Sequence, residues 1–369
     1  MAVAITINPN ATFASQLGGI TVRLDSTNAW TGVNSWSGVS SFTGASGLSV
    51  TGPLNVLGGI NGDDGSFRNV LDNGDFTVAQ RGVTGALSGT TGTYPSLDCW
   101  SAYSNNVSAT GTLSQVAGGP VGRYYASLAR TVGNAVAAQY VIGQVCDSFR
   151  SVALAGRVAL LSFWGKAGAT YSGGSLTIRV ESGTGIDQSY YNMILSQWTG
   201  QTELLSASQA ITTTWTRYTF PITVPANCTQ LGFRIFFNSS GTAGMDDSLN
   251  LAGVQLEPGS IATDFEFLPP ALQLANCKRR YQIVAVKLLA GAANINSFGG
   301  AYSRTALPIT MRATPTATIT ALDNGSGWVG STTVLNSSLN PNYCDFWAAA
   351  VQTSAGAYNN IQVTLSADL

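Results

Sequence analysis

Between residues 157 and 256 the sequence is divided into short runs rich in β-branched and aromatic residues, separated by clusters of Gly, Asn and Ser. Runs of this kind are typical of β-strands, and they cover residues 157–166, 175–180, 215–224, 231–238 and 248–256. Almost no helical period accompanies them. Regularly spaced short strands predict a β-sandwich or a barrel, which we assign to residues 67–268.

The composition indicates that the surface of this β-structure is made of hydroxyl and amide groups. Only 9% of the residues are charged, against about 25% in an ordinary globular domain. The 17 basic and 18 acidic residues leave a net charge of −1. Nucleic-acid binding requires clustered cations, and the one basic cluster, residues 278–280, fits a helix end. We therefore expect no nucleic-acid partner.

Several kinds of catalytic and metal site, and some cellular locations, are excluded by residues and segments that the sequence lacks. The chain has no His, which excludes Ser-His-Asp and Cys-His nucleophiles and His-containing zinc sites. The five Cys residues are scattered without a Cys-x-x-Cys motif, so we expect reduced, buried thiols and assembly inside a cell. The N-terminus does not resemble a signal peptide, and no apolar run reaches the ~18 residues that span a membrane. We expect a soluble protein.

Residues 28–62 contain no charged side chain and have a period of six. One large apolar residue recurs in each unit: Trp30, Trp36, Phe42, Leu48, Leu54 and Ile60. Such a repeat is typical of β-solenoids and fibre shafts. One strip cannot form a core alone, so we predict a trimeric shaft over residues 28–66 in which these side chains pack together. The alternative is a flexible linker, although linkers do not carry periodic tryptophans.

The remaining segments complete an all-β plan with one short helix. Residues 1–27 are a candidate attachment segment. Residues 269–282 predict a helix that acts as a hinge, because two prolines open it and basic residues occupy its last turn. Residues 283–369 predict a small β tip domain, with strands at 302–310, 314–322 and 361–365.

Several motifs in order resemble those of bacteriophage tail-fibre and virion-fibre proteins. They are NGDF at 73–76, QRG at 80–82, Asp98 and Trp100, SFW at 162–164 with Lys166, WTRY at 215–218, and AGVQLE at 252–257 with Gly259-Ser260 and Ala262-Thr263. Residues 277–281 (CKRRY), Pro308, residues 311–313 (MRA), Pro315-Thr316 and the final Ala367-Asp368-Leu369 are similar to the parts that follow in that family. The resemblance covers roughly residues 69–320.

The resemblance implies a jelly roll similar to carbohydrate-binding modules, carried on a trimeric fibre that contacts the host surface. One departure is Cys99, which stands where the family usually has Arg and removes a possible ion pair. The first and last motifs, residues 73–76 and 251–260, are expected to be the two strands that close the jelly roll. In similar modules acidic residues there hold a structural Ca²⁺, so Asp75 and Glu257 are candidate ligands. The simpler interpretation is a turn cap and a surface charge.

Aromatic side chains on loops are the candidates for glycan contact, because a ring offers an apolar face to a sugar while nearby polar groups bind its hydroxyls. They are Trp328, Tyr343, Trp347, Tyr190, Tyr191 and Trp198. The alternative for each is a place in the core or in a trimer interface. That alternative is favoured most for Trp164 and Trp215, which sit in predicted strands.

Catalysis of glycoside cleavage would require two carboxylates at a set separation. The chain offers Asp187, Glu203, Asp246, Asp247, Asp264 and Glu266, but the sequence places no two of them across a cleft. We therefore expect no enzyme and no cofactor beyond the candidate Ca²⁺.

The function predicted from the sequence is that of a structural phage protein, a homotrimeric short fibre on the tail or the head. It would be located in the virion, attach to other virion proteins through its N-terminal segment, and bind host-surface polysaccharide. The alternatives are a decoration protein without a receptor role and a polysaccharide depolymerase.

Overall fold

The computed structural model describes residues 68–87, 90, 92–289, 298–324, 328–329, 334–352 and 358–369, all within a compact unit that spans Val56–Leu369. The predicted attachment segment, residues 1–27, lies outside the described residues. So does the predicted shaft at 28–66 with its periodic apolar residues from Trp30 to Ile60.

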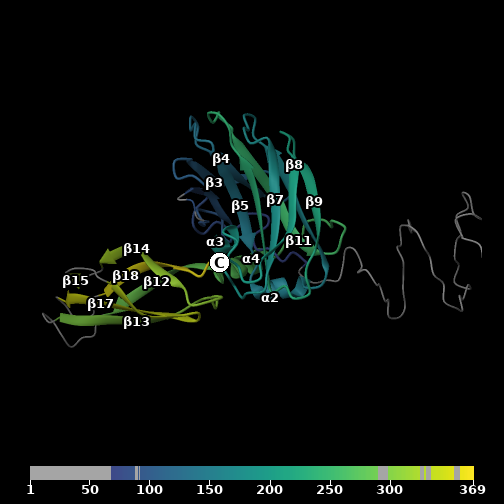
Figure 1. The fold of residues 1–369 in the computed structure, drawn as a ribbon. Helices are drawn as coiled ribbons and strands as arrows, with labels where there is room; N and C mark the ends of the chain where they lie inside the picture. Colours follow the sequence, from purple (N-terminus) through teal and green to yellow (C-terminus); the bar gives the residue numbers. More distant parts are fainter. Residues whose placement is uncertain are drawn as a thin grey trace, which may run out of the picture. The chain divides into compact units, whose positions relative to one another are not determined.

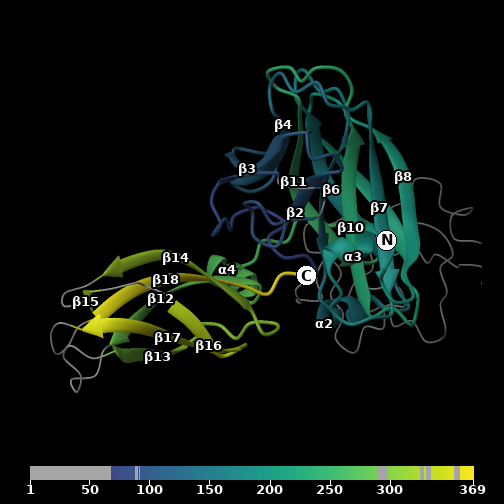
Figure 2. The same ribbon diagram turned by 60° about the vertical axis from the view of Figure 1, so that its left-hand side comes forward.

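Two antiparallel sheets face each other across a shared core (Figures 1 and 2). The first has the order β1 (Thr84–Ala86), β3 (Gly111–Ala117), β4 (Tyr124–Arg130), β11 (Ser248–Pro258), β6 (Val158–Ala167), β9 (Thr216–Thr223). The second has the order β2 (Ser101–Ser104), β5 (Gln139–Val145), β10 (Gln230–Asn238), β7 (Ser175–Gly183), β8 (Thr202–Ala210). The chain crosses repeatedly between the sheets, as in a jelly roll. The predicted all-β sandwich is confirmed, and each predicted strand between 157 and 256 is present.

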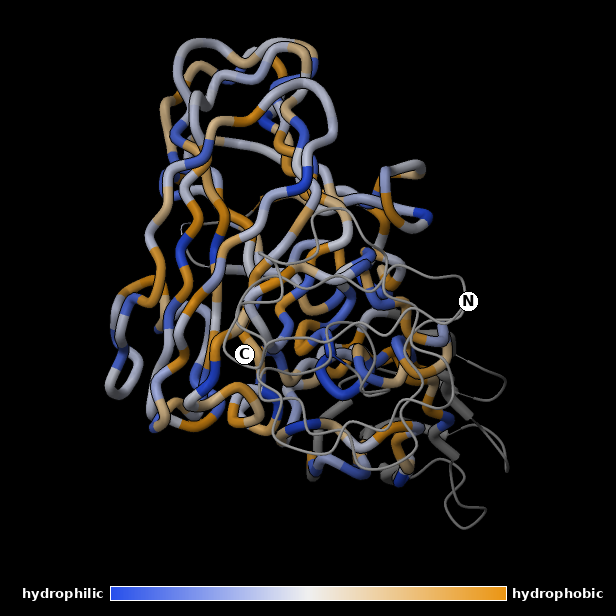
Figure 3. The backbone as a smooth tube through the Cα atoms, turned by 90° about the vertical axis from the view of Figure 1, so that its right-hand side faces the viewer, coloured by the Kyte–Doolittle hydropathy of each residue, from blue (hydrophilic) through white to orange (hydrophobic). Residues whose placement is uncertain are grey.

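The core between the two sheets follows from the alternation of side chains along each strand. On β6, for example, Leu161 and Phe163 are fully buried in the core, as are Ile178 and Val180 on β7. Hydrophobic and hydrophilic residues accordingly alternate along the strands in Figure 3. Burial of each such side chain contributes about 1.5–3 kcal/mol, so this core supplies the main stabilisation of the sandwich.

The helices in the described residues are α2 (Ser148–Ser151), η1 (Val152–Leu154), α3 (Tyr190–Ile194) and α4 (Pro270–Lys278). The helix predicted over 269–282 is confirmed for α4, whose first residue is a proline, as favoured at that position. It is wrong for Tyr281 and Gln282, which begin β12 because their backbones pair with Ser366 and Leu365. In the described part of the chain, no helix has the length and hydropathy to cross a membrane.

A third sheet of seven strands follows α4. Its strands are β12 (Tyr281–Leu289), β13 (Phe298–Ala306), β14 (Thr316–Asn324), β15 (Trp328–Val329), β16 (Val334–Asn340), β17 (Tyr343–Gln352) and β18 (Tyr358–Ser366). The order is β14-β18-β12-β13-β17-β15, with β16 paired to β17. This sheet has its own core, which includes Val286, Phe346 and Val363. The predicted strands here are confirmed in part, since residues 307–310 fall after the end of β13.

The prediction that residues 73–76 form a closing strand is wrong, although they do meet β11. They form a turn in which Asn73 and Phe76 have φ values of 56° and 59°. The Val254 amide donates to the Gly74 carbonyl over 2.9 Å, at the irregularity in β11 between Ala252 and Gln255. A Cβ on Gly74 would lie 2.1 Å from the Val254 carbonyl oxygen. The closely packed backbone, rather than strand pairing, therefore fixes glycine at this position.

Candidate functional site

The outer face of the six-stranded sheet carries aromatic side chains that reach the solvent. On β6, Phe163 points into the core, whereas Trp164 and Lys166 are only half-buried on the opposite face. In the register of the sheet, Trp164 lies opposite Ala252 of β11 on one side and Arg217 of β9 on the other. Because the neighbour on β11 is small, the Trp164 ring is not enclosed by that strand.

Two further rings come from strands on either side. Trp215 directly precedes β9 and Tyr125 lies on β4, and both are half-buried. Their ring centroids are 5.3 Å apart, nearly edge to face, although β11 and β6 separate them in the sheet. The Lys166 Nζ lies 5.4 Å from the centre of the Trp215 ring. We call the three residues Tyr125, Trp164 and Trp215 the aromatic platform.

Polar groups surround the aromatic platform. Asn250 of β11 is paired in the register with Ser127 on one side and with Lys166 on the other. Burial and the Asp246 carboxylate raise the pKa of Tyr125, so its phenol stays protonated at neutral pH and can donate a hydrogen bond. The platform thus combines apolar ring faces with donors and acceptors, which is the chemistry that binds a sugar ring and its hydroxyls.

The rest of the outer face of β11 is covered by the chain that follows it. The Thr263 amide donates to the Glu257 carboxylate over 3.0 Å, and the Thr263 hydroxyl also donates to it. The Gln255 side chain accepts from the Glu266 amide and donates to the Thr263 hydroxyl. Gln255 and Glu257 are consequently fully buried, so the uncovered part of this face is the part that bears the aromatic platform.

Of the predicted glycan contacts, Tyr190 and Trp198 are buried, with 0% and 4% exposure, so their placement on the surface is corrected. The segment forms α3, whose first turn is capped by the Ser189 hydroxyl, and both rings pack on the outer face of the five-stranded sheet. Glycines leave the rings room there, since a Cβ on Gly232 would lie 2.9 Å from Trp198 and a Cβ on Gly143 would lie 2.6 Å from the Tyr190 hydroxyl. Tyr191, on the opposite side of α3, is 41% exposed.

The predicted contacts in the C-terminal sheet lie in strands rather than on loops. Trp328 belongs to β15, and Tyr343 and Trp347 belong to β17. Tyr343 is half-buried, and its ring lies 4.4 Å from the Arg304 guanidinium, which also forms two 2.8 Å hydrogen bonds with the Asp345 carboxylate. The side chains of Trp328 and Trp347 are outside the described part. Of these three side chains only Tyr343 is described, and its ring packs against Arg304 of β13.

The two candidate calcium ligands are occupied by donors of the chain itself. The Asp75 carboxylate accepts from the Thr77 amide and from the Gln273 side chain, and Glu257 accepts from Thr263 as described. In the part of the chain that the structure describes, no group of three or more acidic or Cys side chains is arranged to hold a metal. A Ca²⁺ at Asp75 and Glu257 stays a sequence-based prediction.

Five of the six candidate catalytic carboxylates interact with other groups of the protein. Asp187, Glu203 and Asp247 form ion pairs with Arg312, Arg179 and Arg130, respectively. Asp246 and Glu266 accept hydrogen bonds from the backbone amides of Ala169 and Asn69. The sixth, Asp264, is exposed. These contacts assign structural roles, and the expectation that the chain is not an enzyme stays a prediction.

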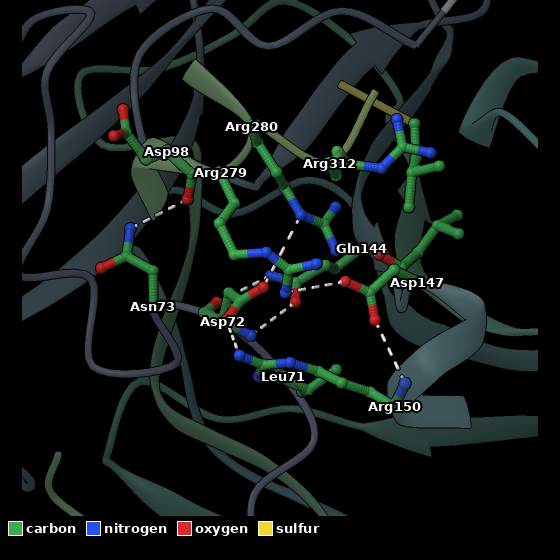
Figure 4. A network of polar contacts seen from close by, with 12 residues as sticks. Leu71, Asp72, Asn73, Asp98, Gln144, Asp147, Arg150, Arg279, Arg280 and Arg312 are labelled. Atoms are coloured by element: carbon green, nitrogen blue, oxygen red, sulfur yellow. Dashed lines mark hydrogen bonds and ion pairs between the residues drawn. The ribbon is translucent and has the colours of Figure 1, made fainter. Parts of the chain in front are cut away.

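The motif residues near the start of the sandwich meet those that follow α4 in a buried polar network (Figure 4). The Asp72 carboxylate lies 2.8 Å from Arg150 and 3.6 Å from Arg280. Gln144 both accepts from and donates to the Asp72 backbone. The Arg280 guanidinium also donates to the Val145 carbonyl over 3.0 Å. Arg280 is only 2% exposed, so these contacts hold Arg280, just after α4, against the sandwich. The hinge role predicted for residues 269–282 stays a prediction.

Asp98 is a second buried carboxylate of this network. It accepts from the Gln80 amide over 3.1 Å and from the Gln80 side chain, and that side chain also donates to the Tyr281 carbonyl. Burial raises the pKa of Asp98 to about 6, although the bonds from Gln80 oppose the shift. Some of the residues in the motifs, namely Asn73, Gln80, Asp98, Arg280 and Tyr281, thus make contacts between the sandwich and the residues that follow α4.

Comparisons with known proteins give matches at the level of solved structures. No family model matches the chain, and no curated protein matches it. A CBM4 structure is 14% identical, with a TM-score of 0.29, over 51% of this chain and 98% of the other. TmCBM61, solved in complex with β-1,4-galactotriose, is 12% identical, with a TM-score of 0.30, over 52% and 99%. The enzymatically active domain of tailspike protein 4 from bacteriophage CBA120 is 15% identical, with a TM-score of 0.31, over 52% and 21%.

Proposed function

We propose that the sandwich binds glycan through the aromatic platform. The supporting observation is the grouping of Tyr125, Trp164 and Trp215 on one uncovered sheet face, beside the Lys166 ammonium. Half-exposed aromatic rings on a rigid sheet lose little entropy when a ligand packs on them. A sugar ring stacked there would place its hydroxyls within reach of Lys166 and the Tyr125 phenol.

Removal of one platform ring is expected to weaken glycan binding by ~10–100-fold, because a large apolar contact contributes about 1.5–3 kcal/mol. The full chain would first be screened on a glycan array. Trp164→Ala and Trp215→Ala would then be titrated by calorimetry against the glycan that binds. Tyr191→Ala, which removes an exposed ring on α3, is the matched control and should bind as the wild type does. If the control alone lost binding and both Trp variants bound normally, recognition would lie at α3, and the proposal that the aromatic platform binds glycan would be wrong.

We further propose that this glycan-binding protein is a homotrimeric fibre of a phage virion, attached through its N-terminal segment and directed at host-surface polysaccharide. The support is the six-residue period over 28–62 and the ordered motifs that resemble phage fibre proteins. Light scattering of the purified full chain should give the molecular mass of a trimer. A stable monomer at micromolar concentration would contradict the trimeric shaft.

Binding without cleavage is part of the same proposal, because five of the six carboxylates considered for catalysis are engaged by protein donors. Incubation with the bound polysaccharide should release no reducing ends. Release that disappears when a pair of carboxylates is replaced would instead identify a depolymerase.

A further inference from the structure

Two thiols meet at the junction between the sandwich and α4. Cys99 lies in the turn that precedes β2, with a φ of 70°, and Cys277 lies in the last turn of α4. They are 1% and 0% exposed and share a small buried cluster with Val78 and Leu274. The two side chains are close enough to interact, since the neighbouring Cys99 thiol, together with burial, raises the pKa of Cys277.

The other three cysteines are placed differently. Cys146 and Cys228 belong to the main core and Cys344 to the core of the C-terminal sheet. The Cys228 thiol donates to the Gln230 carbonyl over 3.4 Å, and the Cys344 thiol to the Thr305 carbonyl over 3.8 Å. All five cysteines are buried, as predicted, and are free in this structure. Among them, only Cys99 and Cys277 share one small cluster.

The elements that carry this pair are held in place on both sides. Four residues before Cys277 on α4, the Gln273 side chain donates to the Asp75 carboxylate and, over 3.3 Å, to the Asn73 side chain. Asn73 in turn donates to the Asp98 carbonyl, next to Cys99, over 2.9 Å. The turn that carries Cys99 and the helix that carries Cys277 are therefore held side by side, and a bond of about 2.05 Å between the sulfur atoms would join two elements that already pack together.

We propose that Cys99 and Cys277 are an oxidative modification site, at which an intramolecular disulfide joins the sandwich covalently to α4. The co-reactant is a small-molecule disulfide such as oxidised glutathione. One Cys thiolate attacks it, forming a mixed disulfide and releasing one glutathione thiol. The second Cys thiolate then displaces the second glutathione. Both cysteines are oxidised by two electrons in total, the small disulfide is reduced to two thiols, and the two Cys protons go to the two glutathiones.

The surroundings make this reaction slow at neutral pH. The neighbouring Cys99 thiol, together with burial, raises the pKa of Cys277, and the thiolate is the reactive form. The pair therefore stays reduced while the chain folds and closes after longer exposure to an oxidising solution. Because the bond links residues far apart in the sequence, it restricts the unfolded chain, and an increase in Tm of ~5–10 °C is expected.

The test uses the full chain, purified under reducing conditions and incubated with oxidised glutathione at pH 8.5, with and without urea below the unfolding transition. Free thiols are then alkylated in denaturant and the peptides are mapped without reduction. The expected result is one linked peptide that joins Cys99 to Cys277, with the other three cysteines alkylated. Cys99→Ser and Cys277→Ser should each abolish the link and the increase in Tm, whereas Cys344→Ser should keep both.

Two outcomes would overturn the proposal. One is that Cys99 and Cys277 remain fully alkylatable in both solutions after a day, while the circular dichroism shows a folded protein. The other is that the linked peptides join Cys99 or Cys277 equally to the remaining cysteines, which would show pairing in the unfolded chain and no site built by the fold.

Discussion

Asp247→Ala is expected to destabilise the sandwich by about 3–5 kcal/mol, because it leaves a buried guanidinium without its counter-charge. The side chains of Asp247 and Arg130 are both fully buried, with a nitrogen–oxygen distance of 2.8 Å. Arg130 also donates to the carbonyls of Asn134 and Gly241 over 2.9 and 3.0 Å. The pair thus ties together chain segments that meet at one end of the sandwich, and loss of the carboxylate affects all of them.

The adjacent residue provides the matched control. Asp246 is exposed and accepts from the Ala169 amide and the Ser248 hydroxyl, each over 2.8 Å. Asp246→Ala should therefore cost about 1 kcal/mol or less. Urea unfolding followed by circular dichroism measures both free energies of unfolding. Equal losses in the two variants would mean that the buried ion pair has no special role.

The strands that could be predicted from the sequence are those with β-branched and aromatic runs, such as β6, β9 and β10. The strands that were missed, such as β4 (YYASLAR) and β8 (TELLSASQA), contain Ala and Ser and, apart from the first residue of β8, no β-branched residue. β8 is an edge strand that pairs with β7 alone. Its extended form is set by that neighbour, and local propensity does not reveal such an effect.

The aromatic platform illustrates why a site on a sheet is hard to find in a sequence. The sequence favours a place in the core or in a trimer interface for Trp164 and Trp215, because both sit in predicted strands. The alternation of side chains along a strand does contain the missing signal. Ser162 and Lys166 lie two residues from Trp164 and therefore on the same face of the sheet, and Arg217 lies two residues from Trp215. Polar residues of the same parity indicate the solvent face. Tyr125, which comes from a strand that was not predicted, could be added only by the sheet order.

The error at Tyr190 and Trp198 has the opposite origin. Their segment contains Asn, Ser and Gln and was interpreted as an exposed loop, but it folds into α3 over two glycines of the five-stranded sheet. The space above Gly143 and Gly232 exists only after β5 and β10 pair. Likewise, the motif residues Gln80, Asp98 and Tyr281 are far apart in the chain, and their shared junction role follows from the tertiary contacts.

The contribution of Asp98 to stability is expected to decrease as the pH rises from about 4 to 7. Its pKa of about 6 in the folded protein is above the ordinary value of 3.8, so between these values the folded state binds more protons than the unfolded state. By linkage, stability then falls with increasing pH. The shift of about 2 units, at 1.36 kcal/mol per unit, corresponds to about 3 kcal/mol. The loss is complete at about pH 7, one unit above this pKa, where the buried carboxylate is ionised in the folded protein.

Asp98→Asn removes this titration and keeps the shape of the side chain. Urea unfolding at several pH values should show that the difference in unfolding free energy, wild type minus variant, falls by about 2 kcal/mol between pH 4 and pH 7. Asp264→Asn, at an exposed carboxyl, serves as the control and should leave the pH dependence of the wild type unchanged. A difference that is constant with pH would mean that Asp98 ionises equally readily in the folded and unfolded chain, and that Gln80 compensates fully for the burial of its charge.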